Sequence, residues 1–481
     1  MDISPVQRQS LITVIWQITF TAIGFLSTMY FAHAVGASIM GAYFLFVAYN
    51  GVFGTVADGG FGNAAVKRIS EGEEPNEYFS AYSVIRLLFT AIVLLFLIMF
   101  KPYFVDLNNS GMFTWLLIVF AVSLIVGIIS SGTAGTGKMG VRTSCVGVGN
   151  ISKLVVQVIA IYLGYEAAGL AAGAVVGLII AALIEIRFLD LHFKRFTIEH
   201  IKKLSTFSFW IFLTSGGMLV FTQADTILIG YFMSNSDVGI YRIVFQFTSI
   251  ATLTTYALRN TLWPRISRWG KLENTCLIEA SLSRAISYSL VLAIPVFTGG
   301  ILLGDKLLFF FYGEEFIAGY AALVVLLAVQ IVNVFQYFFT MYLDALDRPK
   351  QSFKVTVVGV IANIILNILL IPLIGIFGAA VATLVTMVLN AFLARNELSS
   401  LMTIRLEKHT ILAILQASIF MGAFVAGYRL LISFENIIDV LIPVIIGVAI
   451  YGIMLLKVDN TIHKEIMGIV LKIGLPWPRW L

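Results

Sequence analysis

The chain has 481 residues, of which 59% are hydrophobic and only 12% are charged, and its mean hydropathy is +0.96. A soluble domain carries about 45–50% apolar and about 25% charged residues, so this chain has too few charges to cover a water-facing surface. These figures exclude a soluble enzyme, a secreted disulfide scaffold and a disordered protein. They predict an all-α polytopic membrane protein.

The net charge of +5 and the cysteine content exclude further classes. Cys145 and Cys276 are the only two cysteines and lie far apart in the sequence, and the five histidines are dispersed. Isolated cysteines indicate neither a disulfide framework nor a thiolate metal site. In a membrane protein, the placement of Lys and Arg around the spans matters more than their total. We therefore expect no metal centre and no nucleic-acid partner.

Long apolar runs bounded by Gly, Pro or charged residues mark the predicted spans. A membrane-spanning helix needs roughly 20 apolar residues, and runs of this length exclude the ten-residue alternations of a β-barrel. The sequence predicts about fourteen transmembrane helices, at residues 10–33, 38–64, 80–103, 112–134, 143–164, 167–188, 205–231, 237–262, 282–312, 317–344, 352–374, 376–396, 410–428 and 435–456.

The distribution of basic residues gives an orientation. With a cytoplasmic N-terminus, 24 of the 31 Lys and Arg residues fall on the cytoplasmic side, and only Lys101, Lys306 and Arg429 fall on the other. The positive-inside rule predicts this asymmetry, which a wrong helix count would scramble. We expect a multi-pass protein of the plasma membrane with both termini in the cytoplasm. The outer loops are too short to form a domain.

The C-terminal stretch 458–481 is predicted to be a cytoplasmic amphipathic tail. Apolar residues recur in it at helical spacing, which is typical of a helix lying on a membrane surface. A disordered tail is the alternative interpretation. The apolar positions are Ile462, Ile466, Ile469, Val470, Ile473, Trp477 and Trp480.

An internal repeat links the first and second parts of the chain. The segment from Gly41-Ala-Tyr43 to Arg68-Ile-Ser70 matches the segment from Gly239-Ile-Tyr241 to Arg265-Ile-Ser267 in order and, to within one residue, in spacing. Parallel repeats of this kind are a transporter architecture with the substrate between the halves. The predicted parts are a six-helix half at 1–198, a second six-helix half at 199–400, two additional helices at 401–457 and the tail at 458–481.

Four segments resemble the oligosaccharide flippases, also called polysaccharide transporters. These segments are Ala57-Asp-Gly-Gly-Phe-Gly62, Gln223-Ala-Asp-Thr-Ile-Leu-Ile-Gly230, Trp263-Pro-Arg-Ile-Ser267 and Leu343-Asp-Ala-Leu-Asp-Arg-Pro-Lys350. That family belongs to the superfamily of lipid II flippases and multidrug exporters. The resemblance implies movement of a lipid-linked oligosaccharide from the cytoplasmic to the outer leaflet by alternating access. It also implies that the partners of the protein are membrane lipids and the glycosyltransferases or polymerase of the same pathway.

Ionisable residues inside the spans are the candidate site residues. Each costs about 2.5–3.5 kcal/mol at a helix centre, so most of them must face a cavity or one another. The four cations would favour a phosphate or pyrophosphate group, and the two acids could carry a coupling ion, H⁺ or Na⁺, or pair with a cation. The arginines could instead snorkel to the interface. The residues are Arg86, Lys153, Arg242 and Arg259 among the cations and Asp58 and Asp225 among the acids.

Amides inside the spans are a second set of candidates. Gln330 and Asn333 could bind sugar hydroxyls, although intramembrane amides also make interhelical hydrogen bonds. Gly169, Gly173 and Gly177 form a small-residue pattern that predicts tight helix packing.

A near match to a nucleotide-binding loop is rejected. Gly132-Thr-Ala-Gly-Thr-Gly-Lys138 is followed by Met139, which has no hydroxyl to reach a magnesium ion. The segment also follows an apolar helix instead of a strand. We expect no ATP binding.

Three functions compete. A lipid-linked oligosaccharide flippase is the leading hypothesis, and a multidrug or small-solute exporter of the same superfamily is the second. The cation-rich spans favour the flippase, because a predominantly acidic cavity would suit cationic drugs. A membrane-embedded glycosyltransferase or polymerase is the third, and the short loops argue against it. The sequence therefore predicts a transporter without enzymatic activity.

Overall fold

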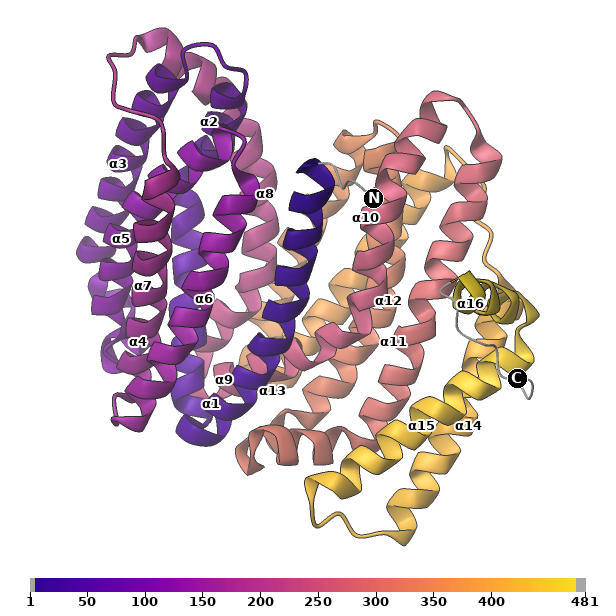
Figure 1. The fold of residues 1–481 in the computed structure, drawn as a ribbon. Helices are drawn as coiled ribbons and strands as arrows, with labels where there is room; N and C mark the ends of the chain where they lie inside the picture. The colour runs from indigo at the N-terminus through magenta and orange to yellow at the C-terminus, as the bar shows by residue number, and fades with distance from the viewer. Residues whose placement is uncertain (1–4, 473–481) are drawn as a thin grey trace. The chain divides into compact units, whose positions relative to one another are not determined.

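The computed structural model describes the backbone of residues 5–472 and the side chains of residues 23–471, except those of 210, 213–215, 218, 220, 260, 466, 469 and 470. All secondary structure in this part of the chain is helical (Figure 1). The α-helices are α1 (Pro5–Asp58), α2 (Phe61–Ser70), α3 (Pro75–Met99), α4 (Val105–Asn109), α5 (Met112–Gly135), α6 (Met139–Tyr162), α7 (Glu166–Glu185), α8 (Ile198–Phe232), α9 (Asn235–Thr248), α10 (Leu253–Lys271), α11 (Thr275–Tyr312), α12 (Tyr320–Ala345), α13 (Pro349–Ser399), α14 (Lys408–Leu431), α15 (Ile437–Val458) and α16 (Asn460–Lys472). Short 3₁₀ turns cover Lys101–Tyr103, Ile186–Phe188, Ser249–Thr252 and Glu314–Gly319.

Within the described residues, ten helices are long and apolar enough to cross a membrane. This finding confirms an all-α polytopic membrane protein. The two longest helices are bent: α1 at Gly36, and α13 at Ile374 and Gly375. Each of them covers two of the predicted spans. The seventh and eighth predicted spans fall on α8 and on α9 with α10, which are not among the ten.

The chain forms two compact units, residues 1–239 and 240–481. In the first unit, α3, α5, α6 and α7 run side by side (Figure 1), and α8 packs against α1, α2 and α3. The predicted boundary after residue 198 comes from the sequence repeat. The boundary after Gly239 comes from packing, which places α8 in the first unit.

A break between α1 and α2 shapes the first unit. Gly59 and Gly60 have φ angles of 58° and 76°, a region that side chains with a Cβ rarely adopt. A Cβ on Gly60 would lie 2.6 Å from the Ser208 carbonyl oxygen of α8. The glycine pair therefore lets the chain turn sharply and lets α8 approach the turn. Asp58 ends α1 directly before this break.

Gly41 of α1 and Gly239 of α9 bring two helix backbones into contact. A Cβ on Gly41 would lie 1.6 Å from the Asn235 carbonyl oxygen, and a Cβ on Gly239 would lie 2.0 Å from the Ala37 carbonyl oxygen. The contact is reciprocal, because each glycine faces the residue four positions before the other. These are the two glycines that the sequence repeat matches to each other.

Small residues also join α6 to α7. A Cβ on Gly173 would lie 2.4 Å from Cγ of Gln157, and one on Gly177 would lie 2.5 Å from the Gly149 carbonyl oxygen. A Cβ on Gly169 would lie 2.8 Å from Cβ of Ala160. The predicted packing face on α7 is therefore confirmed.

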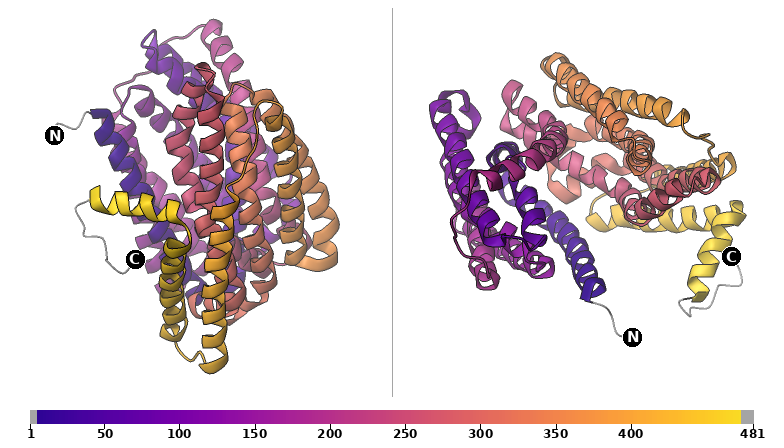
Figure 2. Two further views of the ribbon diagram at one scale, coloured as in Figure 1. Left: turned by 90° about the vertical axis from the view of Figure 1, so that its right-hand side faces the viewer. Right: turned by 90° about the horizontal axis from the view of Figure 1, so that it is seen from above.

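In the second unit, α11 packs against α12 and α14, and α14 packs against α15. α16 turns away from the end of α15 (Figure 2). Asp459 caps the N-terminus of α16. Its Oδ1 accepts hydrogen bonds from the amides of Thr461 and Ile462 at 2.8 and 3.1 Å. The helix covers residues 460–472 of the predicted amphipathic tail. Ile473, Trp477 and Trp480 lie outside the described residues.

The reciprocal glycine contact predicts a stability effect. Gly239→Ala or Gly41→Ala should destabilise the protein by about 1–3 kcal/mol, because the added methyl group forces two helix backbones apart. The measurement is the thermal unfolding temperature of the purified full chain in detergent.

Gly54→Ala in α1 is the matched control, because a Cβ there has nothing within 4 Å. This change should be neutral or slightly stabilising, since Ala favours helix more than Gly does. Equal unfolding temperatures for all three variants would contradict the close contact.

Candidate functional site

Two of the predicted site residues, Asp58 and Arg86, form an ion pair in the first unit. Nη1 of Arg86 on α3 contacts Oδ1 of Asp58 at the end of α1. Oδ2 of Asp58 accepts a hydrogen bond from the Gly62 amide at 3.2 Å, in the first turn of α2. A carboxylate is favoured at a helix N-terminus because the free amides and the helix dipole point toward it. Asp58 therefore joins the break between α1 and α2 to α3.

The ion pair is surrounded by further polar groups. Arg86 donates to the Ser123 carbonyl oxygen of α5 at 3.1 Å and to the Tyr82 hydroxyl at 3.0 Å. Ser131 of α5 donates to the same Tyr82 hydroxyl at 3.2 Å. Only 12% of the Arg86 side chain and 27% of the Asp58 side chain are exposed. The arginine thus points into the bundle instead of snorkelling to an interface.

Lys153, the third predicted residue of this unit, lines a cavity of about 210 Å³ between α1, α5, α6 and α7. Asn50, Asn150 and Ser130 are among the other polar residues of its wall. Within the described part of the chain, no hydrogen bond or ion pair is recorded for the Lys153 ammonium. The cavity therefore contains a cation that a bound anion could neutralise.

Glu185 lines the same cavity and is an acid that the sequence analysis missed. It is 1% exposed, and its Oε2 accepts a hydrogen bond from Ser130 at 2.7 Å. Its Oε1 is buried without a recorded hydrogen-bond donor. Ser130 and Ser131 are neighbours on α5, so α5 connects the Glu185 cavity to the Arg86 network. Glu185 looks like a loop acid in the sequence because Arg187 follows it near the end of a span.

In the second unit, Arg259 of α10 is held by aromatic residues. Its Nη1 donates to the Tyr337 hydroxyl of α12 at 2.8 Å. The guanidinium carbon lies 5.3 Å from the centre of the Tyr337 ring and 5.8 Å from that of Trp263, which are cation–π distances. Asp344, two turns beyond Tyr337, interacts with Arg259 electrostatically. Trp263 and Asp344 were named from the sequence only within the family motifs, and Tyr337 was not singled out.

The two predicted amides lie on the same face of α12 as Tyr337. Gln330 is buried and donates to the Thr248 hydroxyl at 3.2 Å, and Asn333 donates to Oε1 of Gln330 at 3.3 Å. This arrangement joins α12 to α9 and uses the amide of Gln330 in an interhelical hydrogen bond. Asn333 is only partly buried.

The remaining two predicted residues, Asp225 and Arg242, lie on α8 and α9. Asp225 is buried in α8, with 7% of its surface exposed. Arg242 lies on α9 with its guanidinium carbon 5.6 Å from the centre of the Phe245 ring. Their assignment as ion-carrying acid and cavity cation stays a prediction.

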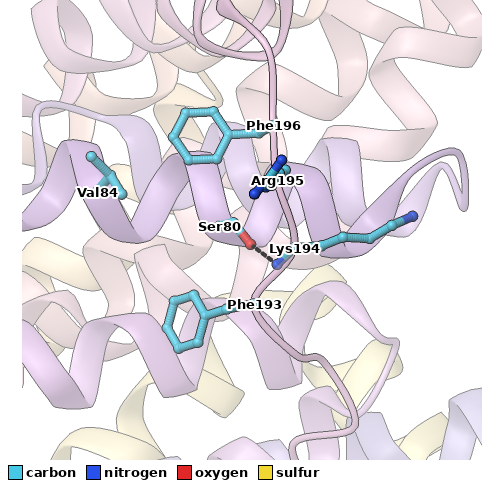
Figure 3. Close-up of a pocket in the computed structure, with 6 residues that line it drawn as sticks. All are labelled: Ser80, Val84, Phe193, Lys194, Arg195 and Phe196. Atoms are coloured by element: carbon cyan, nitrogen blue, oxygen red, sulfur yellow. Dashed lines mark hydrogen bonds between the residues drawn. The ribbon is translucent and has the colours of Figure 1, made fainter.

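A different hollow, of about 490 Å³, lies beside the start of α3 and is lined by no predicted site residue (Figure 3). The extended chain after α7 crosses α3 here, and the Lys194 amide donates to the Ser80 hydroxyl at 2.8 Å. The Lys194 ammonium pairs with Glu77, which raises the pKa of the lysine. Phe193 and Phe196 flank the crossing. These contacts hold the connection between α7 and α8 against α3.

No group of three or more His, Cys, Asp or Glu residues that could hold a metal ion occurs among the described residues. The candidate clusters described in each unit consist of charged, amide and aromatic side chains. Such groups can bind and release a polar ligand.

Comparison with protein families identifies similar proteins over most of the chain. Residues 6–269 match the family model described as polysaccharide biosynthesis protein. Residues 211–369 match the MatE family model.

Two curated relatives come from Haloferax volcanii. The chain is 27% identical to the probable low-salt glycan biosynthesis flippase Agl15, over 96% of this chain and 99% of that protein. It is 25% identical to the probable flippase AglR, over 94% of this chain and 96% of that protein.

A solved structure has the same fold. It is the structure of lipid II flippase MurJ in an inward closed conformation. The alignment covers 95% of this chain and 100% of the MurJ chain, with a TM-score of 0.79 and 18% identity. The predicted resemblance is confirmed, and so is the prediction of a transporter instead of an enzyme.

The Asp58–Arg86 pair predicts a non-additive effect of substitution. Asp58→Asn should destabilise the protein by about 3 kcal/mol, because it leaves Arg86 mostly buried without its counter-ion. The double variant Asp58→Asn/Arg86→Gln should recover much of this loss. The measurement is a double-mutant cycle of unfolding free energies in detergent.

Arg68→Gln is the control, because Arg68 forms an ion pair with Glu71 at a more exposed position. An exposed pair contributes about 0–1 kcal/mol. Strictly additive losses at Asp58 and Arg86 would show that the two charges do not depend on each other.

Proposed function

We propose, since the chain belongs to the family of polysaccharide biosynthesis proteins, that it moves a lipid-linked oligosaccharide from the cytoplasmic to the outer leaflet of the plasma membrane. The carrier lipid presents a phosphate or pyrophosphate, and transport proceeds by alternating access. The observation that carries the proposal is the near full-length similarity to two proteins named as flippases, Agl15 and AglR. The fold shared with MurJ agrees with it.

The charges of the site support an anionic substrate. Asp58 neutralises Arg86, so Lys153 and Arg259 are the cations of the described clusters that carry no direct ion pair in the structure. Phosphate oxygens form strong charge-assisted hydrogen bonds with both side-chain types. Arg86 remains a proposed phosphate ligand in states where the Asp58 pair opens, and Arg242 remains a proposed fourth cation.

The second candidate function is a multidrug or small-solute exporter. The match of residues 211–369 to the MatE family model favours it. A cationic drug would be repelled by an unpaired Lys153 and by Arg259, so the charges argue against this candidate.

The proposed topology has fourteen membrane segments and cytoplasmic termini. The bends at Gly36 and Gly375 support it, because they divide α1 and α13 each into two pieces that are long enough for one span apiece. The sequence match between the segments 41–70 and 239–267 supports two parallel six-helix halves.

The proposed energy source is an H⁺ or Na⁺ gradient, with Asp58 and Asp225 as the acids that carry the ion. At Asp58 the ion would compete with Arg86 for the carboxylate, so loading would release the arginine. The proposed partners are the glycosyltransferases that build the substrate and the polymerase or transferase that consumes it.

The proposal predicts a defect in cells. Depletion of the protein should cause the lipid-linked oligosaccharide to accumulate on the cytoplasmic leaflet, as measured by extraction and mass spectrometry with labelling of sugars exposed at the cell surface. Lys153→Ala and Arg259→Ala should each reduce rescue by about 10-fold or more, because a charge-assisted hydrogen bond contributes about 1.5–3 kcal/mol.

Lys271→Ala is the matched control, because Lys271 is an exposed cation at the end of α10. It should rescue as the wild type does at equal protein abundance. Unchanged surface glycans and no accumulation on depletion would contradict the proposed function.

A further inference from the structure

Aromatic residues of α10 and α12 gather around Arg259. Tyr256, Arg259 and Trp263 follow one another on α10 at spacings of three and four residues, which places them on one face of the helix. Tyr337 of α12 completes the cluster. We call Tyr256, Trp263 and Tyr337 the aromatic platform.

We expect the platform to face a polar space instead of lipid. Arg259 lies in the eighth predicted span, and an ionisable residue in a span faces the protein interior or water. Tyr256 and Trp263 share the face of Arg259, so they face the same space. Tyr256 is 49% exposed, and Trp263 and Tyr337 are partly exposed.

The geometry of the platform suits a flat ligand with a charge at one end. The Tyr256 and Tyr337 rings lie 5.4 Å apart and at 85° to each other, so they form a corner. Arg259 is fixed beside this corner by its 2.8 Å hydrogen bond to the Tyr337 hydroxyl. A guanidinium held in this way binds phosphate oxygens in a defined orientation.

We infer that the aromatic platform binds the sugar adjoining the phosphate of a lipid-linked saccharide, while Arg259 binds that phosphate. This inference rests on the proposed function and adds which residues contact the sugar. A pyranose ring has a face of C–H groups, and these groups are attracted to the electron-rich face of an aromatic ring. The sugar next to the phosphate is the only one near enough to Arg259 to reach both.

A purely structural role for the platform makes a different prediction. Tyr337 binds Arg259 directly, so its loss would disturb the arginine and the packing of α10 on α12 together. Tyr256 contacts the Tyr337 ring, and no hydrogen bond or ring contact to Arg259 is recorded for it. Tyr256 is therefore the residue that tests sugar binding with the least disturbance of the cation.

The test measures binding of two probes of equal charge to the full chain in lipid nanodiscs. The probes are a polyprenyl phosphate bearing one glucose and a polyprenyl methyl phosphate without sugar. The wild type should bind the glucose probe more tightly. Tyr256→Ala should weaken binding of the glucose probe by about 2- to 10-fold and leave the methyl probe unchanged, and Tyr256→Phe should keep the preference.

Two controls separate the contribution of the sugar contact from that of the phosphate contact. Leu277→Ala removes an exposed apolar side chain of α11 instead and should change neither affinity. Arg259→Gln should weaken both probes by a similar factor, because it removes the phosphate contact.

The results that would contradict sugar binding by the platform differ from those that would also contradict the proposed function. Equal affinities of the wild type for the two probes, or an equal effect of Tyr256→Ala on both, would overturn the platform and leave the proposed function standing. Failure of the wild type to bind either probe would overturn the proposed function and this inference with it.

Discussion

The ion pair of Asp58 and Arg86 joins the helices of the first unit at the point where α1 breaks. Asp58 binds the amide of Gly62 at the start of α2, and Arg86 reaches from α3 to the Ser123 carbonyl oxygen of α5. A charge inside a span is costly unless another group compensates it. The pair therefore fixes how these four helices meet, and substitution of one partner leaves the other charge unbalanced.

The same constraint distinguishes structural charges from charges available to a ligand. Arg86 is paired with the Asp58 carboxylate. Lys153 lines a cavity and forms no ion pair or hydrogen bond through its ammonium group among the described residues, and Arg259 is hydrogen-bonded to the uncharged Tyr337. A protein that binds and releases an anionic substrate needs cations of the second kind. Glu185 adds an acid to the Lys153 cavity, so this cavity is lined by ionisable groups of both signs.

Much of the fold follows from the sequence, because apolar length and glycine spacing act locally. The all-helical membrane architecture and the packing face at Gly169, Gly173 and Gly177 were predictable in this way. Asp58 and Arg86 were each candidates, but their pairing was not predictable, since 28 residues and a helix break separate them. Tyr256 and Tyr337 were missed because an aromatic residue in an apolar helix looks like core until a charged neighbour is placed beside it.

Reconstitution tests most directly whether the protein transfers a lipid-linked saccharide between leaflets, as proposed. The purified chain is placed in liposomes that contain a lipid-linked oligosaccharide with a fluorescent label on its sugar. A membrane-impermeant quencher is then added outside. If the protein transfers the lipid, quenching should extend beyond the outer-leaflet pool, and heat inactivation of the protein should abolish this extra quenching. Quenching equal to that of protein-free liposomes, under an imposed H⁺ or Na⁺ gradient as well as without one, would contradict this transfer.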